Sequence, residues 1–397
     1  MKAGSTELTY CTNIHPGESW EEVRANLGRY VPQVKRRVAS DQSFGIGLRL
    51  SAAAAEALRD EDARFEFLRF LRDEGLYVST LNGFPYGTFH GARVKEGVYL
   101  PDWREDARLD YTNLLADLFA GWLSEAGRPS GCISTVPGAF KPNASTTDDL
   151  GRIVERLIRH AAHLVAIERD RGCRIVLGLE PEPCCLLETV EETVRFFRDH
   201  LHSAAAASRL AELTGIDADA SSRALRRHLG VCLDLCHAAV EFEDPAACFA
   251  ALEHAGVEIA KIQVTAGLLV DPVSEAAVAA LRGFEDAIYL HQVVERRDGK
   301  LRRYADLGLA MDSGVWRDGR SEWRIHFHVP VFVDALESFS STQSFVREAL
   351  RLHRDRPRSS QLEVETYTWS VLPPQHRALP IDEAIARELD WVRGVLE

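Results

Sequence analysis

Three carboxylates occupy equivalent places in this sequence, each directly after a short apolar run: Glu180, Asp234 and Glu365. If these runs are parallel strands of one barrel, their carboxyl ends share one rim, and the three side chains meet there. Carboxylates that are brought together and withdrawn from water repel one another strongly. A divalent cation relieves that repulsion, so we expect these residues to bind manganese, magnesium, zinc or cobalt.

The residues around the first carboxylate read Glu180-Pro181-Glu182-Pro183. A glutamate after a strand is commonly no more than a favourable charge at the start of the next helix. Here two prolines restrict the backbone and prevent a helix from beginning at once. We therefore expect Glu180 to bind the metal, and Glu182 to contact the substrate or to support the ligands.

The second carboxylate, Asp234, is followed three residues later by His237. In the first turn of a helix, this spacing places both side chains on the same side. The alternative is that Asp234 only caps the helix while His237 lies on the surface. We favour a functional site that contains both residues.

The third carboxylate ends the run Leu362-Glu363-Val364-Glu365, in which apolar and acidic residues alternate. Alternate residues of a strand share one face, so the register decides which glutamate reaches the rim. We favour Glu365, because it stands at the end of the run. Glu363 is expected to form a salt bridge away from the site.

Two histidines, His326 and His328, alternate along a strand-like stretch and therefore point to one face. Two histidines on one face can bind a metal, although they also suit the polar face of an exposed strand. Their segment has to pack over the barrel, so we expect His328 as a metal ligand and His326 near the substrate. His291, earlier in the same segment, is a weaker candidate for a substrate contact.

Several other polar residues stand at or after strand ends and are expected near the substrate: Asn13, His15 and Asn82. Gln263 lies at the same level near the end of another apolar run. A long loop follows Asn82, and we expect it to act as a lid that carries Tyr86, His90 and Lys95.

Short apolar runs alternate with long helix-like stretches along the whole chain, a pattern typical of parallel β/α units. Eight units predict an α/β fold of the (β/α)8 barrel (TIM barrel) class. A doubly wound open sheet is the alternative, but no glycine-rich nucleotide fingerprint follows any run. The predicted strands cover residues 8–14, 44–50, 76–81, 132–136, 174–179, 230–233, 258–264 and 361–364.

Two inserts interrupt this pattern within a single domain that spans residues 1–397. Residues 203–229 are rich in Ala, Ser and Arg and predict a helical insert before the sixth strand. Residues 267–340 predict a large, β-rich insert after the seventh strand. It contains Asp298-Gly299, a strong signal for a two-residue hairpin turn.

The composition narrows the class of partner. The formal net charge of -13 disfavours nucleic acid, so a small-molecule metabolite is the expected partner. The eight cysteines include no C-x-x-C pair, which disfavours a cysteine-based zinc site and suits a reducing, cytoplasmic location. There is neither a signal-like start nor an apolar run long enough to span a membrane. Homo-oligomer formation is left open.

The order strand-Glu, strand-Asp-x-x-His, strand-Gln, strand-Glu resembles the xylose-isomerase-like barrel superfamily of sugar isomerases, ketose epimerases and endonuclease-IV-type nucleases. In the epimerases, Glu, Asp, His and Glu from consecutive strands hold the metal. Glu180, Asp234 and Glu365 match three of these ligands. Gln263 falls where the histidine would be. The resemblance thus implies that the fourth ligand is the carbonyl oxygen of Gln263 or a nitrogen of His328.

The resemblance also implies roles in catalysis. Glu180 and Glu365 would exchange a proton with the two faces of the substrate, while the metal polarises its carbonyl and hydroxyl. His237 matches the histidine that contacts the substrate. The glutamine at position 263 departs from the family pattern and puts the epimerase reaction itself in question.

Several segments resemble a narrower group, the EboE family of metabolite traffic proteins. They are the Glu180–Pro183 segment, the residues around Asp234 and His237, Tyr289-Leu290-His291-Gln292, and 326–332. Three functions therefore compete. They are a metal-dependent isomerase or epimerase of a small hydroxylated metabolite, a non-catalytic binding or escort protein in a prenyl or secondary-metabolite transport pathway, and an endonuclease-IV-like phosphodiesterase. The net charge and the missing histidine disfavour the last.

Overall fold

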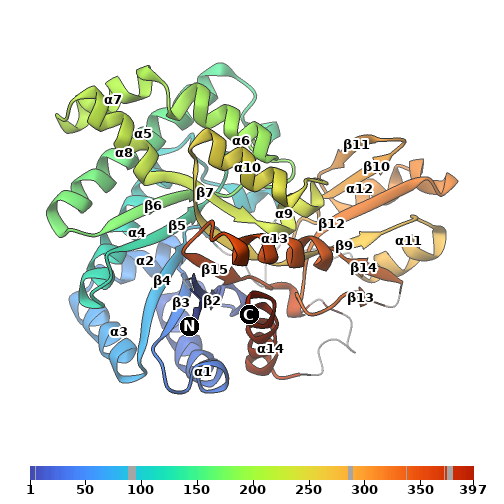
Figure 1. Cartoon of the computed structure of the whole chain (residues 1–397), viewed down its shortest axis with the longest axis horizontal. Coiled ribbons are helices and arrows are strands. Elements are labelled where there is room, and N and C mark those ends of the chain that lie inside the picture. Colours follow the sequence, from blue (N-terminus) through green and yellow to red (C-terminus); the bar gives the residue numbers. More distant parts are fainter. Residues whose placement is uncertain (5, 88–94, 285–288, 337, 371, 373–378) are drawn as a thin grey trace.

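A computed structural model describes residues 1–4, 6–87, 95–284, 289–336, 338–370, 372 and 379–397. Its centre is a parallel sheet with the strand order β2-β15-β8-β7-β6-β5-β4-β3 (Figure 1). The strands are β2 (Thr6–Tyr10), β3 (Phe44–Arg49), β4 (Leu76–Asn82), β5 (Ser130–Thr135), β6 (Arg174–Leu179), β7 (Leu229–Asp234), β8 (Glu258–Val264) and β15 (Gln361–Val364). The eight predicted strands are confirmed, and their boundaries differ from the predicted ones by two residues or fewer except at the end of the first strand.

The largest difference is at the end of the first strand. A strand was expected to continue to Ile14, but β2 ends at Tyr10 and a short 3-10 turn covers Thr12–Ile14. The hydroxyl of Thr12 accepts a hydrogen bond from the backbone N–H of Arg49 at 2.9 Å, which fixes this turn against the neighbouring strand. Asn13 is thereby turned toward the barrel mouth, where it lines the pocket.

The barrel closes between β2 and β3. A parallel bridge joins Cys11 to Gly47, and the hydroxyl of Thr9 donates to the carbonyl of Gly45. A side chain at position 47 would collide with the carboxylate of Glu363, which crosses the interior at this level. Glycine at this position therefore allows the strands to meet while a charged group remains inside the barrel.

Helices cover the outside of the barrel in the order that β/α units require. Ser19 caps α1 with a full capping box, and Ser51 caps α2. The main covering helices are α1 (Trp20–Val38), α2 (Ala52–Ala57), α3 (Glu61–Asp73), α4 (Asp106–Glu125), α5 (Thr147–Arg171), α6 (Val190–Phe196), α10 (Pro245–Ala255), α13 (Gln343–Asp355) and α14 (Ile381–Leu396).

Both inserts have the predicted type of structure. The first forms α7 (Ala204–Thr214) and α8 (Ala218–His228). The second forms a six-stranded antiparallel sheet with its own apolar core, seen at the right of Figure 1. Its hairpin turns at Asp298-Gly299, where both residues have positive φ. The strands are β9 (Ala266–Val270), β10 (Val293–Arg297), β11 (Lys300–Tyr304), β12 (Ser321–Val329), β13 (Ala335–Leu336) and β14 (Phe339–Ser341).

None of the helices in the described ranges combines the length and the apolar character that crossing a membrane requires.

Candidate metal and substrate site

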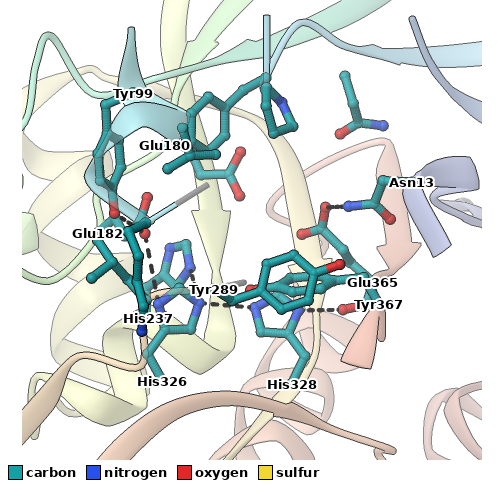
Figure 2. Close-up of a pocket in the computed structure, with 16 residues that line it drawn as sticks. Asn13, Tyr99, Glu180, Glu182, His237, Tyr289, His326, His328, Glu365 and Tyr367 are labelled. Atoms are coloured by element: carbon teal, nitrogen blue, oxygen red, sulfur yellow. Dashed lines mark hydrogen bonds and ion pairs between the residues drawn. The ribbon is translucent and has the colours of Figure 1, made fainter. Parts of the chain in front are cut away.

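A single pocket gathers most of the predicted residues at the C-terminal ends of the barrel strands (Figure 2). It encloses about 60 Å³, several times the space that one water molecule needs. Its lining combines acidic and histidine side chains with aromatic and aliphatic ones. The lining residues are Asn13, Asn82, Phe84, Pro85, Lys95, Val98, Tyr99, Glu180, Glu182, His237, Tyr289, Leu290, His326, His328, Glu365 and Tyr367.

Glu180, Asp234 and Glu365 converge as expected and form what we call the carboxylate cluster. One oxygen from each lies within 4.8 Å of the other two, and all three residues are buried. Burial, opposed in part by Lys261, raises the pKa of Glu180 to about 7. Burial and the charges of Glu180 and Asp234 raise the pKa of Glu365 well above its usual value. Ionisation of the whole cluster is therefore unfavourable without a counter-ion, and a bound cation would stabilise the ionised form.

Asp234 serves two purposes that the sequence analysis set against each other. Its Oδ1 caps α9 (Leu235–Val240), accepting from the backbone N–H groups of Cys236 at 2.6 Å and His237 at 3.3 Å. The same oxygen accepts from the hydroxyl of Thr265 at 3.1 Å. Its Oδ2 is buried and accepts no hydrogen bond in the described structure. One oxygen therefore caps the helix while the other remains available to a cation.

The register at the end of β15 separates its two glutamates. Glu365 lines the pocket, where the amide of Asn13 donates to its Oε1 at 2.6 Å. Glu363 points into the barrel and forms an ion pair with the ammonium of Lys261 at 3.0 Å, with both side chains fully buried. The amide of Asn82 also donates to Glu363 at 2.8 Å. The predicted salt bridge of Glu363 is confirmed.

Gln263 lies inside the barrel, on the layer of Asp234 and Glu363, with which it is paired in register. Its amide donates to the carbonyl of Asn82 at 3.3 Å. Its carbonyl oxygen is buried and accepts no hydrogen bond within the described ranges. Gln263 does not line the pocket itself. A second buried, unpartnered oxygen thus lies in the same layer as the carboxylate cluster.

His237, His326 and His328 form what we call the histidine cluster. The Nδ1 atom of each ring faces an acceptor oxygen: the carbonyl of Pro181 for His237 at 2.8 Å, the side-chain carbonyl of Gln292 for His326 at 2.8 Å, and the carbonyl of Glu365 for His328 at 2.5 Å. The Nε2 atom of His326 lies 3.1 Å from that of His237 and 3.1 Å from that of His328.

The three rings differ in their electrostatic environment. Burial and the neighbouring rings lower the pKa of His326 well below its usual value. Burial lowers the pKa of His328 to about 4. Burial also acts to lower the pKa of His237, but the charges of Asp234, Glu182 and Glu180 outweigh it and the net shift is upward. The acidic groups thus favour positive charge on the side of the cluster nearest to Asp234.

Glu182 sits behind the histidine cluster in a hydrogen-bonded position. Its Oε1 accepts from the hydroxyl of Tyr99 at 2.6 Å and from the amide of Gln292 at 3.1 Å. Burial raises its pKa. Glu182 lines the pocket, so its predicted place near the substrate agrees with its position.

Three predicted substrate contacts are not brought to the pocket. His15 stacks on Tyr30 and lines a separate depression, because the chain turns outward after Asn13. Tyr86 packs edge-on against Tyr111. His291 turns its Nδ1 toward the backbone carbonyl of His326 at 3.1 Å, so it supports the strand that carries the histidines. Of the predicted lid, Lys95 lines the pocket and His90 lies outside the described residues.

Several residues of the site were not identified from the sequence. Lys261 is the inward neighbour of Gln263 on β8, and strand alternation could have identified it. Gln292 fixes the ring of His326 and lies beside His291 in a motif that the sequence analysis had noted. Tyr99 ends a short 3-10 helix (Lys95–Tyr99) and Tyr367 lies in a loop, and in neither place does a periodic pattern mark a side chain as inward.

Comparisons with known proteins concern the fold. No family model and no curated protein matches the chain. Its structure is similar to that of a xylose isomerase domain protein from Planctomyces limnophilus (11% identity, TM-score 0.48, 98% of this chain and 96% of that one). It is also similar to an IolI protein with a bound zinc atom (12%, TM-score 0.46, 98% of each chain) and to a D-psicose 3-epimerase studied with D-fructose (13%, TM-score 0.45, 98% and 99%). Similarities this distant carry no argument about chemistry, which has to come from the side chains.

Proposed function

We propose that this chain is a metal-dependent enzyme that moves a proton within a small hydroxylated metabolite, in the manner of an isomerase or epimerase. The observation that carries the proposal is the carboxylate cluster. Three buried carboxylates meet at one pocket, and two of them, Glu180 and Glu365, have a raised pKa. Raised carboxyl pKa values in a cleft are typical of groups that exchange protons near neutral pH.

The residues present fit a divalent cation. The unpartnered Oδ2 of Asp234 and carbonyl oxygen of Gln263 are buried, and a buried oxygen without a donor is costly unless something binds it. Glu180, Asp234 and Glu365 would hold the ion through oxygen atoms, which suits manganese or magnesium and also accepts zinc or cobalt. When bound, such an ion supplies Lewis acidity toward a substrate carbonyl or hydroxyl.

Two carboxyl groups of the protein would transfer the proton. Glu180 and Glu365 reach the pocket from opposite sides of Asp234 along the strand order, after β6 and β15. One would take a proton from a substrate carbon and the other would return a proton to the neighbouring face. Asn13 holds the Oε1 of Glu365 at 2.6 Å and so fixes the position of that carboxyl group.

The pocket's charge favours a neutral substrate. Lys95 is its only lysine or arginine among the described lining residues, and Lys95 pairs with Asp306 at 2.6 Å. Phe84, Val98 and Leu290 add apolar side chains to the lining, which pack against carbon rather than against charge. A phosphorylated substrate would therefore find little compensation. The enclosed volume also argues against a polymer such as DNA.

The deciding experiment compares purified protein with Glu180→Gln and Glu365→Gln variants. Metal-loaded wild-type protein, incubated in D2O with a panel of neutral hydroxyketones and sugars, should exchange a carbon-bound hydrogen for deuterium in at least one of them. Each variant should lose that exchange by roughly 10²- to 10⁴-fold, the usual worth of a general acid or base. Full exchange in both variants would refute the proposal. A Glu363→Gln variant changes a glutamate inside the barrel that does not line the pocket. It tests whether the loss of isotope exchange depends on the position of Glu180 and Glu365 in the pocket.

A second candidate is the binding or escort function suggested by the resemblance to the EboE family. Gln263 in place of a histidine favours it, since the departure affects the position where the epimerases complete their metal site. So does the insert, whose His326, His328 and Tyr289 close over the pocket. Native mass spectrometry that finds a retained small molecule, with no isotope exchange under any metal, would support this function over catalysis.

A further inference from the structure

We propose that the histidine cluster, His237, His326 and His328, binds a second divalent cation, separate from the one at the carboxylate cluster and joined to it through Asp234. The proposal goes beyond the proposed function and does not require that the carboxylate cluster be catalytic. It rests on the direction in which the three rings present their nitrogen atoms.

The hydrogen bonds of the rings fix which nitrogen carries the hydrogen. The carbonyls of Pro181 and Glu365 can only accept, so the Nδ1 atoms of His237 and His328 must donate. The side-chain amide of Gln292 is oriented because its nitrogen donates to Glu182 and to the carbonyl of Pro183, at 3.1 and 3.3 Å. Its oxygen therefore faces His326, whose Nδ1 must donate as well. Each neutral ring then presents a bare lone pair at Nε2.

These lone pairs point at one another. The Nε2 of His326 is 3.1 Å from the Nε2 of each of its two neighbours, a separation that leaves no room for a water molecule between them, and all three rings are buried. If His237 carried a proton on Nε2, it could donate to the lone pair of His326 and satisfy that contact. The lone pair of His328 would still face the Nε2 of His326 without a proton between them. A cation can accept such lone pairs, because Asp234, His237 and His328 offer ligand atoms within 4.8 Å of one another and the Nε2 of His326 lies 3.1 Å from both rings.

The spacing agrees with a metal ion. Zinc binds imidazole nitrogen at 2.0–2.1 Å, so two ligands of a tetrahedral site lie about 3.3 Å apart. The observed 3.1 Å separations are close to that value. The Nδ1 contacts match the usual support of metal-binding histidines, in which the second nitrogen donates to a carbonyl or carboxylate. Such contacts hold each ring in position before any ion binds.

Asp234 supplies the fourth ligand. Its unpartnered Oδ2 lies 3.8 Å from the Nε2 of His237, and its ligand atoms group with both histidines and carboxylates. Two other groups lie within reach, but both are less suited. Glu182 is already engaged by two donors, and Cys236 groups with His326 and His328 but not with His237. The carboxylate of Asp234 thus connects the two clusters.

The two clusters should select different ions. Three imidazoles favour zinc, cobalt or nickel, whereas the carboxylate cluster suits manganese or magnesium. The centre would therefore hold a nitrogen-bound ion that is difficult to exchange beside an oxygen-bound ion that exchanges readily. This difference makes the two sites separable by experiment.

Metal-free full-length protein is reloaded with zinc, and the number of zinc ions bound per chain is measured by native mass spectrometry. We expect two ions per wild-type chain, one in a His326→Ala/His328→Ala variant, and one in a Glu180→Gln/Glu365→Gln variant. A His353→Gln variant, altered at a buried histidine that bonds Thr6 far from the pocket, should keep two. One ion in wild-type protein that both double variants lose would overturn the proposal, since it would indicate a single mixed site.

A spectroscopic measurement does not depend on the histidine variant folding. The Glu180→Gln/Glu365→Gln protein loaded with one cobalt(II) ion should show the strong visible absorption of a four-coordinate, nitrogen-rich site, and zinc X-ray absorption should show scattering from imidazole rings. Weak, six-coordinate cobalt absorption without imidazole scattering would refute the histidine site. Two bound ions without isotope exchange would leave this inference standing while the proposed function fails.

Discussion

The two clusters of the pocket obtain their geometry in different ways. The carboxylate cluster comes from the barrel, where each acid stands at the end of a parallel strand. The histidine cluster takes two of its rings from β12 of the insert and one from α9, and each ring is fixed by a hydrogen bond at its far nitrogen. The barrel supplies charge at positions that its topology dictates, and the insert supplies nitrogen ligands that depend on precise support. One cluster is set by the fold, the other by local contacts.

Asp234 is the residue that both clusters share, so its replacement should have the largest effect. In Asp234→Asn, the amide oxygen can keep the cap of α9 and the hydrogen bond from Thr265, which preserves the fold. The amide nitrogen would replace the free carboxylate oxygen and cannot bind a cation. We expect metal affinity to fall by more than about 100-fold at both clusters, measured by competition with a chelator.

If Asp234→Asn weakened only one of the two ions, the connection between the clusters would be wrong. The melting temperature of the metal-free variant serves as its control. It should remain near that of metal-free wild-type protein, because the cap is retained.

Two glutamine variants, each expected to weaken metal binding at a different cluster, should have a smaller effect on metal affinity than Asp234→Asn. Gln292→Leu removes the acceptor that orients His326, and should weaken zinc binding at the histidine cluster by roughly 10- to 100-fold. Gln263→Leu removes the unpartnered oxygen in the barrel layer, and should weaken manganese binding at the carboxylate cluster instead. Isothermal titration of each metal into each variant measures the four affinities.

Manganese binding to the Gln263→Leu variant would also decide whether Gln263 or His328 is the fourth ligand at the carboxylate cluster. If Gln263→Leu leaves manganese binding unchanged while His328→Ala abolishes it, His328 completes that cluster. The histidine cluster would then lose its separate identity.

The same contrast explains what the sequence could and could not predict. Parallel strands are buried on both faces and read as apolar runs, so all eight strands and the carboxylates at their ends could be located. The two histidines of β12 were found because alternate residues of a strand share a face. The positions of His15, Tyr86 and His291 depend on turns and side-chain rotamers that no periodic pattern records. Lys261 could have been placed on the inward face of β8 by strand alternation, but its ion pair with Glu363 joins two strands that are distant in the sequence, and no local pattern records that contact.

The smallest expected effect is a pH dependence of stability to which the carboxylate cluster contributes through Glu180. The folded-state pKa of Glu180 is about 7, above that of the unfolded chain, because burial disfavours the ionised form. A carboxyl group with a raised pKa contributes stability at low pH, and that contribution is lost as the pH rises through the folded value. The melting temperature of metal-free protein should therefore fall between about pH 4.5, the usual pKa of a glutamate, and about pH 7. Saturating metal should remove the share of the decline that Glu180 contributes.

Glu180→Gln isolates this contribution, because the amide cannot ionise. Other buried carboxyls also titrate in this range, and Glu388, with a pKa raised by burial to about 8, lies on α14, bonded to Thr366. Glu388→Gln is thus the matched control, since it should remove its own share of the decline without affecting the response to metal. Glu180→Gln should reduce both. A decline that persists unchanged in Glu180→Gln would show that the carboxylate cluster does not carry the charge that we assign to it, and the contrast with the histidine cluster would then rest on ligand type alone.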